Sequence, residues 1–274
     1  MKVLIVGGVA GGATTAARLR RVSENSEIII FEKGPYVSFA NCGLPYHLSG
    51  TIRDREQLLV TSAEDLHHLL NLDVRTNQEV LSIDRANKTV TVRDLLNQRD
   101  YTESYDKLLL SPGASPIVPP LPGVDQEGVF VLHNIPELDD IVAWIKTHHP
   151  KNAVVVGGGF IGLEVAENLV ELGLKVELVE MLNQVMAPVD FELAAEVHQH
   201  LEMHGINLHL GDGLKAIEAG QNKVLQVNTS SGLALETDLV ILSIGVRPNS
   251  GLAKDAGLEM EPRGHICVNR QMQT

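Results

Sequence analysis

A unit of strand, glycine turn, helix and strand occurs twice in this chain, and this repeat constrains the fold more than any other feature. The first copy opens with the apolar run at 2–6, turns at glycines into the helical composition AGGATTAARLRRV, and ends in SEIIIFEK. The second copy, after Ala153, reads VVVGGGFIGLEVAENLVELGLKVELVEM. Each copy is the pattern of a βαβ unit, so the sequence predicts an α/β fold with two Rossmann-like units.

The similarity between the two copies continues further along the chain. DKLLLSPG at 106–113 matches DLVILSIG at 238–245, at a constant offset of 132. An alternating segment that predicts a hairpin precedes each match, with turns expected at Asn87–Lys88 and near Asn222–Lys223. We therefore expect three-layer units, each with a parallel sheet and a β-meander.

A proline-rich segment, ASPIVPPLPGV at 114–124, marks the passage between the units. We expect the second unit to be inserted into the first. The first domain then comprises residues 1–115 and 246–274, and the second domain comprises residues 116–245.

Composition excludes several classes of function. The net charge of −13 argues against nucleic acid and anionic membranes as partners, because binding phosphates requires clustered Lys and Arg. The apolar start MKVLIV is too short for a signal sequence or a membrane span, so we expect a cytoplasmic protein. Two cysteines, 225 positions apart, do not form a disulfide framework, and Cys267 is expected in a strand core.

The second glycine turn matches the GxGxxG fingerprint of dinucleotide sites in full, at Gly157, Gly159 and Gly162. Such a turn presents backbone N–H groups and a helix N-terminus to pyrophosphate. Glu180 follows eighteen residues after the last glycine and ends the second strand, where its carboxylate would bind a ribose diol and repel a 2′-phosphate. The pattern predicts a site for NADH in preference to NADPH. The alternative is a turn that only packs helix on strand.

The first glycine turn departs from the fingerprint. Gly7 and Gly12 hold the outer positions, but Val9 occupies the middle one, with Gly8 and Gly11 beside it. An acid again ends the second strand, at position 32, twenty residues after the last glycine. A nucleotide diphosphate with a free ribose diol, such as FAD, fits this pattern. Residues 1–115 and 246–274 are therefore expected to bind FAD, and residues 116–245 to bind NAD(H).

An insertion in the first copy contains a lone cysteine. Glu32 and Asp106 are 74 positions apart, whereas Glu180 and Asp238 are 58 apart, so the first copy has about sixteen extra residues (74 − 58). They include SFANCGLPY, in which Asn41 or Cys42 can begin a helix with Pro45 in its first turn. A helix N-terminus stabilises a thiolate, which suggests a reactive Cys42. The alternative is a buried, inert thiol.

SFANCGLPY, GGVAGG, GGGFIGLE and GVRPN together closely resemble the pyridine nucleotide–disulfide oxidoreductases. More narrowly, the chain looks like the branch of coenzyme A disulfide reductases and NADH-dependent persulfide reductases. Relatives with a CxxxxC pair have a second cysteine where this chain has His47, so a mechanism with two cysteines is excluded. In the resembling branch, a single thiolate forms a mixed disulfide with coenzyme A.

The resemblance implies hydride transfer from NADH to FAD and electron transfer to Cys42, the catalytic residue. It implies cofactor contacts along the whole chain, at Gly7, Gly8, Ala10, Gly11, Gly12, Glu32, Lys33, Asn41, Val80, Ser111, Gly113, Gly157, Gly159, Phe160, Ile161, Gly162, Glu180 and Gly245. For coenzyme A as substrate or ligand, it implies contacts at Thr14, Arg18, Arg21, Ser38 and Asn41. Three of these are spaced i, i+4, i+7 on one face of the first helix, although a basic face can also be merely solvated.

Family members continue into a flavin-ribitol motif and a dimerisation domain, so this chain is expected to be the N-terminal portion of a longer homodimeric enzyme. The alternatives are an NADH oxidase or peroxidase that cycles through a Cys42 sulfenic acid, and a nucleotide-binding redox sensor without catalysis. No metal site is expected, because His200 and His204 have ligand spacing but no third ligand.

Overall fold

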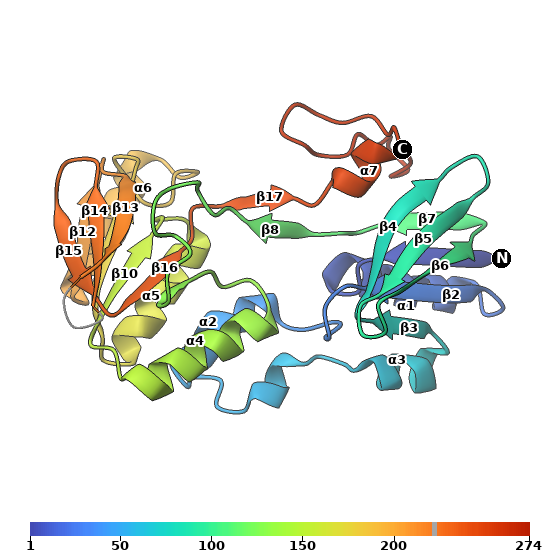
Figure 1. Cartoon of the computed structure of the whole chain (residues 1–274), viewed down its shortest axis with the longest axis horizontal. Coiled ribbons are helices and arrows are strands. Elements are labelled where there is room, and N and C mark those ends of the chain that lie inside the picture. Colours follow the sequence, from blue (N-terminus) through green and yellow to red (C-terminus); the bar gives the residue numbers. More distant parts are fainter. Residues whose placement is uncertain (221–223) are drawn as a thin grey trace. The chain divides into compact units, whose positions relative to one another are not determined.

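The computed structural model describes residues 1–220 and 224–274, and within them the chain divides into two compact units (Figure 1). Unit 1 comprises Met1–Ala40, Glu56–Ser115 and Arg247–Thr274, and unit 2 comprises Asn41–Arg55 and Pro116–Val246. The segment 41–55 thus packs with unit 2, whereas the boundaries drawn from the sequence assign it to the first domain. The turn expected near Asn222–Lys223 lies outside the described residues.

Unit 1 contains a parallel four-stranded sheet in the order β3-β2-β1-β7. Its strands are β1 (Lys2–Val6), β2 (Glu27–Glu32), β3 (Asp73–Thr76) and β7 (Lys107–Leu110). Helix α1 (Ala10–Val22) connects β1 to β2, and α3 (Ala63–Leu70) precedes β3. Because β1 pairs in parallel with β2 and with β7, the first predicted βαβ unit is confirmed.

The sheet of unit 1 is covered on both faces. Val3 and Ile5 belong to a buried cluster that includes Ala16 of α1, and the alternate residues Leu4 and Val6 belong to a different one. That other cluster contains three valines of the meander, Val80, Val90 and Val92. A strand buried on both faces needs apolar residues at every position, which explains the uninterrupted run in β1.

The meander of unit 1 consists of three antiparallel strands, β4 (Gln78–Asp84), β5 (Thr89–Asp94) and β6 (Arg99–Ser104). The turn between β4 and β5 includes Lys88 in the left-handed region, with φ of 50°, so the hairpin predicted at Asn87–Lys88 is confirmed. The short elements η2 (Arg55–Leu58) and α7 (Gly251–Asp255) complete the regular structure around this unit.

Unit 2 repeats the plan with a parallel five-stranded sheet in the order β12-β11-β10-β16-β9. Its strands are β9 (Val129–Phe130), β10 (Asn152–Val156), β11 (Lys175–Glu180), β12 (Ile206–Leu210) and β16 (Leu239–Leu242). Its longer helices are α4 (Ile135–His148), α5 (Phe160–Glu171) and α6 (Phe191–Met203). Here α5 connects β10 to β11, so the second predicted βαβ unit is also confirmed.

A second meander, β13 (Leu214–Ala219), β14 (Leu225–Thr229) and β15 (Ala234–Thr237), belongs to unit 2. Its residues Ile217 and Val227 are in one buried cluster with Val154 and Val240 of the parallel sheet. Both units therefore have a parallel sheet with a meander packed on one face. The predicted α/β class with two Rossmann-like units is confirmed.

Two strands, β8 (Ala114–Pro116) and β17 (Val246–Pro248), lie where the chain passes between units, and they form a two-stranded sheet. Cys267, expected in a strand, follows an isolated bridge at Ile266 in an irregular segment and is half-buried. Among the described residues, no helix combines the length and apolar character needed to cross a bilayer.

Candidate dinucleotide cradles and cysteine site

The glycine turn of unit 1 lies between β1 and α1 and leaves no space for side chains at its outer glycines. Gly7 has φ of +94°, and a Cβ there would lie 2.0 Å from the carbonyl oxygen of Ser111. A Cβ on Gly12, in the first turn of α1, would lie 1.7 Å from the carbonyl oxygen of Gly7. These glycines are needed for the close packing of turn, helix and neighbouring strand.

The turn of unit 2 has the same construction. Gly157 has φ of +109°, and a Cβ there would lie 2.4 Å from the carbonyl oxygen of Ser243. A Cβ on Gly162 would lie 1.9 Å from the carbonyl oxygen of Gly157. The middle glycine differs, because Gly159 has φ of −80° and no atom lies within 4 Å of its Cβ position. Its missing side chain leaves free space in front of the N-terminus of α5.

The two acids that end β2 and β11 each bind the glycine turn through one carboxylate oxygen and the backbone two residues further along the chain through the other. Glu32 Oε2 accepts from the N–H of Gly8 at 2.7 Å, and its Oε1 accepts from the N–H of Gly34 at 2.7 Å. Glu180 does the same, with the N–H of Gly158 at 2.6 Å and that of Leu182 at 2.7 Å. A carboxylate oxygen can accept a second hydrogen bond, so each acid can also accept from a ribose hydroxyl.

A loop after each acid folds back over its glycine turn. In unit 2, the N–H of Met186 donates to the carbonyl of Gly158 at 2.8 Å, and the Cγ1 of Val185 would lie 2.8 Å from a Cβ on Gly158. In unit 1, Ser38 and Val37 make the equivalent contacts to Gly8, at 3.1 and 2.9 Å. Ser38 and Met186 both lie in the left-handed region, with φ of 47° and 53°.

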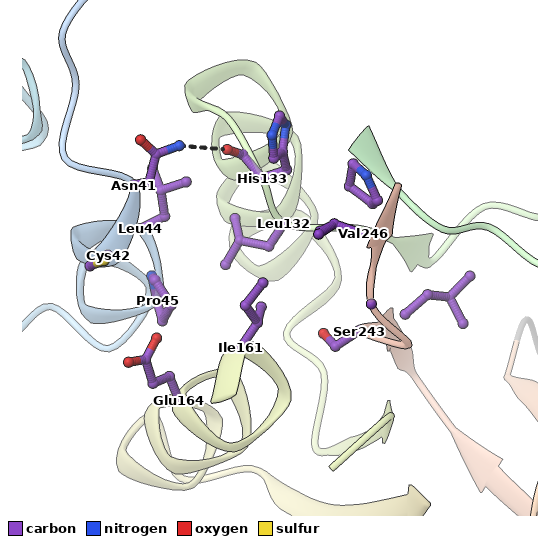
Figure 2. Close-up of a pocket in the computed structure, with 13 residues that line it drawn as sticks. Asn41, Cys42, Leu44, Pro45, Leu132, His133, Ile161, Glu164, Ser243 and Val246 are labelled. Carbon is purple, nitrogen blue, oxygen red and sulfur yellow. Dashed lines mark hydrogen bonds between the residues drawn. The ribbon is translucent and has the colours of Figure 1, made fainter. Parts of the chain in front are cut away.

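The cysteine segment consists of a 3₁₀ turn, η1 (Asn41–Gly43), followed by the short helix α2 (Leu44–Leu48). The helix is expected to begin at Asn41 or Cys42, but only the 3₁₀ turn begins there; α2 begins at Leu44, with Pro45 in its first turn as expected. Leu44 and Leu48 are buried, whereas Cys42 is a free, exposed thiol. The segment packs with unit 2, where the side-chain amide of Asn41 donates to the carbonyl of His133 at 3.3 Å (Figure 2). Exposure of Cys42 contradicts the alternative of a buried, inert thiol.

A cavity of about 180 Å³ lies within unit 2, beside the cysteine segment (Figure 2). Its lining comes mainly from η1 and α2, the segment just before α4, the first turns of α5 and the end of β16, and comprises Asn41, Cys42, Leu44, Pro45, Pro116, Leu132, His133, Ile161, Glu164, Leu242, Ser243, Gly245 and Val246. The hydroxyl of Ser243 is buried and has no hydrogen-bond partner in the described structure. An apolar cavity with one unpaired hydroxyl and one carboxylate suits a flat ring with a polar substituent.

Two groups with raised pKa values, Glu164 and Tyr46, lie in or near this cavity. Burial, and then the neighbouring carboxylate of Glu167, raise the pKa of Glu164. Burial raises the pKa of Tyr46, and the charges of Glu164, Glu167 and Cys42 raise it further. Both shifts favour the protonated form of the group.

The structure places the remaining predicted cofactor residues in different environments. Lys33 pairs with Glu79 at 2.8 Å, and Val80 is buried in the core of unit 1. Ile161 lines the cavity of unit 2, whereas Phe160, one residue earlier, is 60% exposed at the start of α5. Among the rest, Ala10 is exposed, Gly11 would place a Cβ 2.4 Å from the hydroxyl of Ser111, Gly113 has a positive φ, and Gly245 lines the cavity.

The residues implied for coenzyme A fall into both units. Thr14, Arg18 and Arg21 are exposed on α1 in unit 1, and Ser38 belongs to the same unit. Asn41 belongs to unit 2. The intervening Arg20 has a structural role, because its guanidinium donates to the carbonyls of Leu70, Asn71, Glu24 and Ser26.

Three residues of unit 2 that the sequence did not single out are conspicuous in the structure. Ser243 has the unpaired hydroxyl described above, and His198 of α6 accepts from the N–H of Val185 at 3.1 Å. Glu137, in the first turn of α4, has a buried carboxylate oxygen without a partner, and burial raises its pKa. Of these three, only Glu137 could have been found from the sequence, because Asn134 and Glu137 have the spacing of a helix-capping pair.

Comparisons with known proteins agree with this architecture. The curated relatives include the coenzyme A disulfide reductase of Staphylococcus aureus strain JH9, which is 34% identical over 273 residues, 100% of this chain and 60% of the relative. The chain therefore spans less than two thirds of the length of that relative.

The similar solved structures include the following three. The reduced CoADR-RHD of Bacillus anthracis has a TM-score of 0.96 and 49% identity, over 99% of this chain and 48% of that one. The NAD-dependent persulfide reductase of A. fulgidus has a TM-score of 0.94 and 34% identity, over 98% and 50%. The water-forming NADH oxidase of Lactobacillus brevis, bound to NADH, has a TM-score of 0.90 and 34% identity, over 96% and 57%.

The family model described as pyridine nucleotide-disulphide oxidoreductase matches residues 1–274, the whole chain. Each unit has a glycine turn and an acid at the end of its second strand, which is the pattern of a dinucleotide-binding unit. The chain belongs to the pyridine nucleotide-disulphide oxidoreductase family.

Proposed function

We propose that this chain carries the electron-transfer part of a flavoprotein that uses NADH to reduce coenzyme A disulfide or coenzyme A persulfide. The observation that carries the proposal is the combination of two dinucleotide cradles with one exposed thiol, Cys42, beside a cavity. Because the chain spans only part of its relatives, this activity is proposed for the full-length protein. The full-length protein is further proposed to be a cytoplasmic homodimer.

The first cradle is assigned to FAD and the second to NADH. FAD, when bound, supplies two-electron chemistry between a nicotinamide and a sulfur atom. At each turn the outer glycines allow strand, turn and helix to pack closely, and the N-terminus of α1 or α5 supplies unpaired N–H groups for a pyrophosphate. The residues present therefore fit the two cofactors.

Glu180 supports NADH as the reductant. Its two oxygens are held by the N–H groups of Gly158 and Leu182, so the carboxylate is fixed at the edge of the turn. There it can accept from the 2′- and 3′-hydroxyls of a ribose, whereas a 2′-phosphate would be repelled by like charge. The cavity beside Ile161, Glu164 and Ser243 is assigned to the nicotinamide end.

Cys42 is assigned the sulfur chemistry. Its thiolate attacks one sulfur of coenzyme A disulfide, forming a mixed disulfide while the other coenzyme A leaves as a thiolate. Two electrons then break the mixed disulfide, release the second coenzyme A thiolate and restore the Cys42 thiolate. With a persulfide the thiolate attacks the sulfur bonded to coenzyme A, and hydrosulfide leaves. Within the described residues no second cysteine adjoins Cys42, so the partner sulfur comes from the substrate.

The phosphates of coenzyme A are assigned to the basic face of α1. Arg18 and Arg21 are exposed there beside Thr14, and neither guanidinium pairs with a carboxylate in the described structure. Ser38 and Asn41 complete the proposed set.

The test is a steady-state comparison of four acceptors with the full-length protein: coenzyme A disulfide, coenzyme A persulfide, hydrogen peroxide and oxygen. We expect Cys42→Ser to abolish turnover with disulfide while NADH still bleaches the flavin. Cys267→Ser is the matched control and is expected to turn over normally. Turnover with disulfide in the Cys42→Ser variant would overturn the proposal.

An NADH oxidase or peroxidase is the second candidate, and the similarity to the water-forming NADH oxidase favours it. Here Cys42 would cycle between thiolate and sulfenic acid. Consumption of oxygen or peroxide without formation of any thiol would establish this alternative. A protein whose flavin is not bleached by NADH under anaerobic conditions would instead be a nucleotide-binding sensor.

A further inference from the structure

A histidine of α6 fixes the loop that covers the second glycine turn. The Nε2 of His198 lies 3.1 Å from the backbone nitrogen of Val185. A backbone N–H can only donate, so Nε2 must be the unprotonated acceptor and the imidazole is neutral with its proton on Nδ1. Phe191 is the first residue of the same helix. Its ring packs edge-on against this imidazole, with the ring centroids 6.4 Å apart.

Val185 in turn contacts the turn directly. Its side chain is fully buried, and its Cγ1 would lie 2.8 Å from a Cβ on Gly158. The next residue, Met186, donates its N–H to the carbonyl of Gly158 at 2.8 Å. The N–H of Gly158 is bound by Glu180, the acid assigned to the ribose. A continuous series of contacts thus joins His198 to this carboxylate.

Unit 1 has the loop without the histidine. Val37 and Ser38 make the same contacts to Gly8 that Val185 and Met186 make to Gly158. Among the residues that the structure describes, no side chain accepts from the N–H of Val37. The loop of unit 1 leads instead into the cysteine segment. The bond from α6 is therefore an addition that is specific to the second cradle.

We propose that His198 is a positioning residue for the adenosine half of NADH. As a neutral acceptor it holds Val185, and through Val185 the Gly158–Glu180 edge, in the arrangement that binds the ribose diol. The inference rests on the proposed assignment of the second cradle to NADH. It concerns binding of the dinucleotide and not the sulfur chemistry at Cys42.

The experiment measures NADH affinity of the full-length protein by calorimetry, for three substitutions at one position. His198→Leu removes the acceptor at similar size, and we expect the dissociation constant of NADH to rise about five- to tenfold, the effect of one lost hydrogen bond. His198→Gln places an acceptor at the position of Nε2, so affinity within about twofold of wild type is expected. His198→Asn is too short to reach Val185 and should behave like the leucine variant.

Controls separate positioning from general damage. His200→Leu, on the exposed side of the same helix, should leave NADH affinity unchanged. Flavin content and kcat with saturating NADH should be unchanged in all variants, and amide exchange at Val185 should accelerate in the Leu and Asn variants only. If circular dichroism shows that the leucine variant is unfolded, the NADH affinity of the asparagine variant is used for the test instead.

Two results would overturn the inference. One is wild-type affinity in the Leu and Asn variants. The other is equal weakening in the Gln, Leu and Asn variants, because the ring would then act only by packing. Absence of NADH binding to the wild-type protein would instead refute the proposed function.

Discussion

The glycine turns of units 1 and 2 share their outer glycines but differ at the middle position. Gly7 and Gly157 have positive φ, and at Gly12 and Gly162 a Cβ would meet the carbonyl oxygen of the first glycine of the turn within 2 Å. At the middle position unit 1 has Val9, whereas unit 2 has Gly159 with open space around its Cβ position.

The GxGxxG motif combines two requirements, close packing within the protein and space for a ligand, and the difference between the two turns separates them. The outer glycines are demanded by the protein itself, because any side chain would strike backbone. The middle glycine is not demanded by the protein, so its value lies in the approach of a ligand. Unit 1 can therefore lose the middle glycine and still form the turn, and the Glu32 carboxylate binds that turn as Glu180 binds the other.

The largest effect is expected from a methyl group at an outer glycine. Gly162→Ala places a Cβ 1.9 Å from the carbonyl of Gly157, so strand and helix must separate. We expect unit 2 to lose about 3 kcal/mol of unfolding free energy and NADH affinity to fall at least about a hundredfold. Gly12→Ala should likewise lower the unfolding free energy of unit 1 and the flavin content of the protein.

Hydrogen exchange measured separately for β10 and β1 checks this prediction, together with flavin absorbance and NADH titration. Each substitution should act on its own unit. Retention of NADH binding by the Gly162→Ala variant would contradict the geometric argument.

The second prediction concerns an ion cluster in unit 1. The Arg75 guanidinium bonds to Asp73 at 2.6 Å, Glu103 at 2.8 Å and Tyr101 at 3.1 Å, and lies over the ring of Phe31. Arg75→Leu leaves Glu103 partly unpaired where its side chain is only 17% exposed, so we expect a loss of about 2 kcal/mol in the stability of unit 1. Chemical denaturation checks this value.

Arg93→Leu is the matched control for Arg75→Leu. Arg93 pairs with Asp100 across β5 and β6, and both side chains are 43% exposed. An exposed pair contributes little, so the unfolding midpoint should not change. A loss equal to that of Arg75→Leu would show that burial of the cluster does not matter.

The third prediction tests the middle glycine. Gly159→Ala adds a methyl group that contacts no protein atom at a φ that alanine adopts freely, so stability should be unchanged. The methyl group would occupy space assigned to the pyrophosphate, and NADH affinity should fall about tenfold. Thermal unfolding and NADH titration of one sample separate the two effects. A destabilised Gly159→Ala variant with normal affinity would reverse the interpretation of the motif.

The smallest effect is expected at Glu137 in unit 2. Burial raises the pKa of this carboxyl. The charge of His133 and hydrogen bonds from the backbone N–H groups of His133 and Asn134 lower the pKa, but burial has the larger effect. The folded protein therefore holds this proton more tightly than the unfolded chain, so Glu137 reduces stability at neutral pH and ceases to do so as pH falls below the ordinary carboxyl range. Glu137→Gln should raise the melting temperature on the order of a degree at pH 7 and have no effect near pH 4. A constant difference across that range would exclude titration as the cause.

Much of the fold was predictable because its signals are local. The apolar run of β1, the helical composition of α1 and the hairpin at Lys88 each depend on neighbouring residues, and the offset of 132 revealed the duplication. Within the site, the outer glycines and terminal acids were predictable for the same reason. The bonds from Glu32 to Gly8 and from Glu180 to Gly158 were not, since each joins the acid to a turn more than twenty residues earlier.

By itself, the sequence determined the two βαβ units, the glycine turns and the isolation of Cys42 from any second cysteine. These follow from periodicity, from residues without side chains, and from counting. Only the tertiary structure decided that the segment 41–55 packs with unit 2, that Ser243 has an unpaired hydroxyl in a cavity, and that His198 accepts from Val185. Such contacts join residues distant in the chain, and side-chain burial and hydrogen-bond geometry arise only when the elements pack.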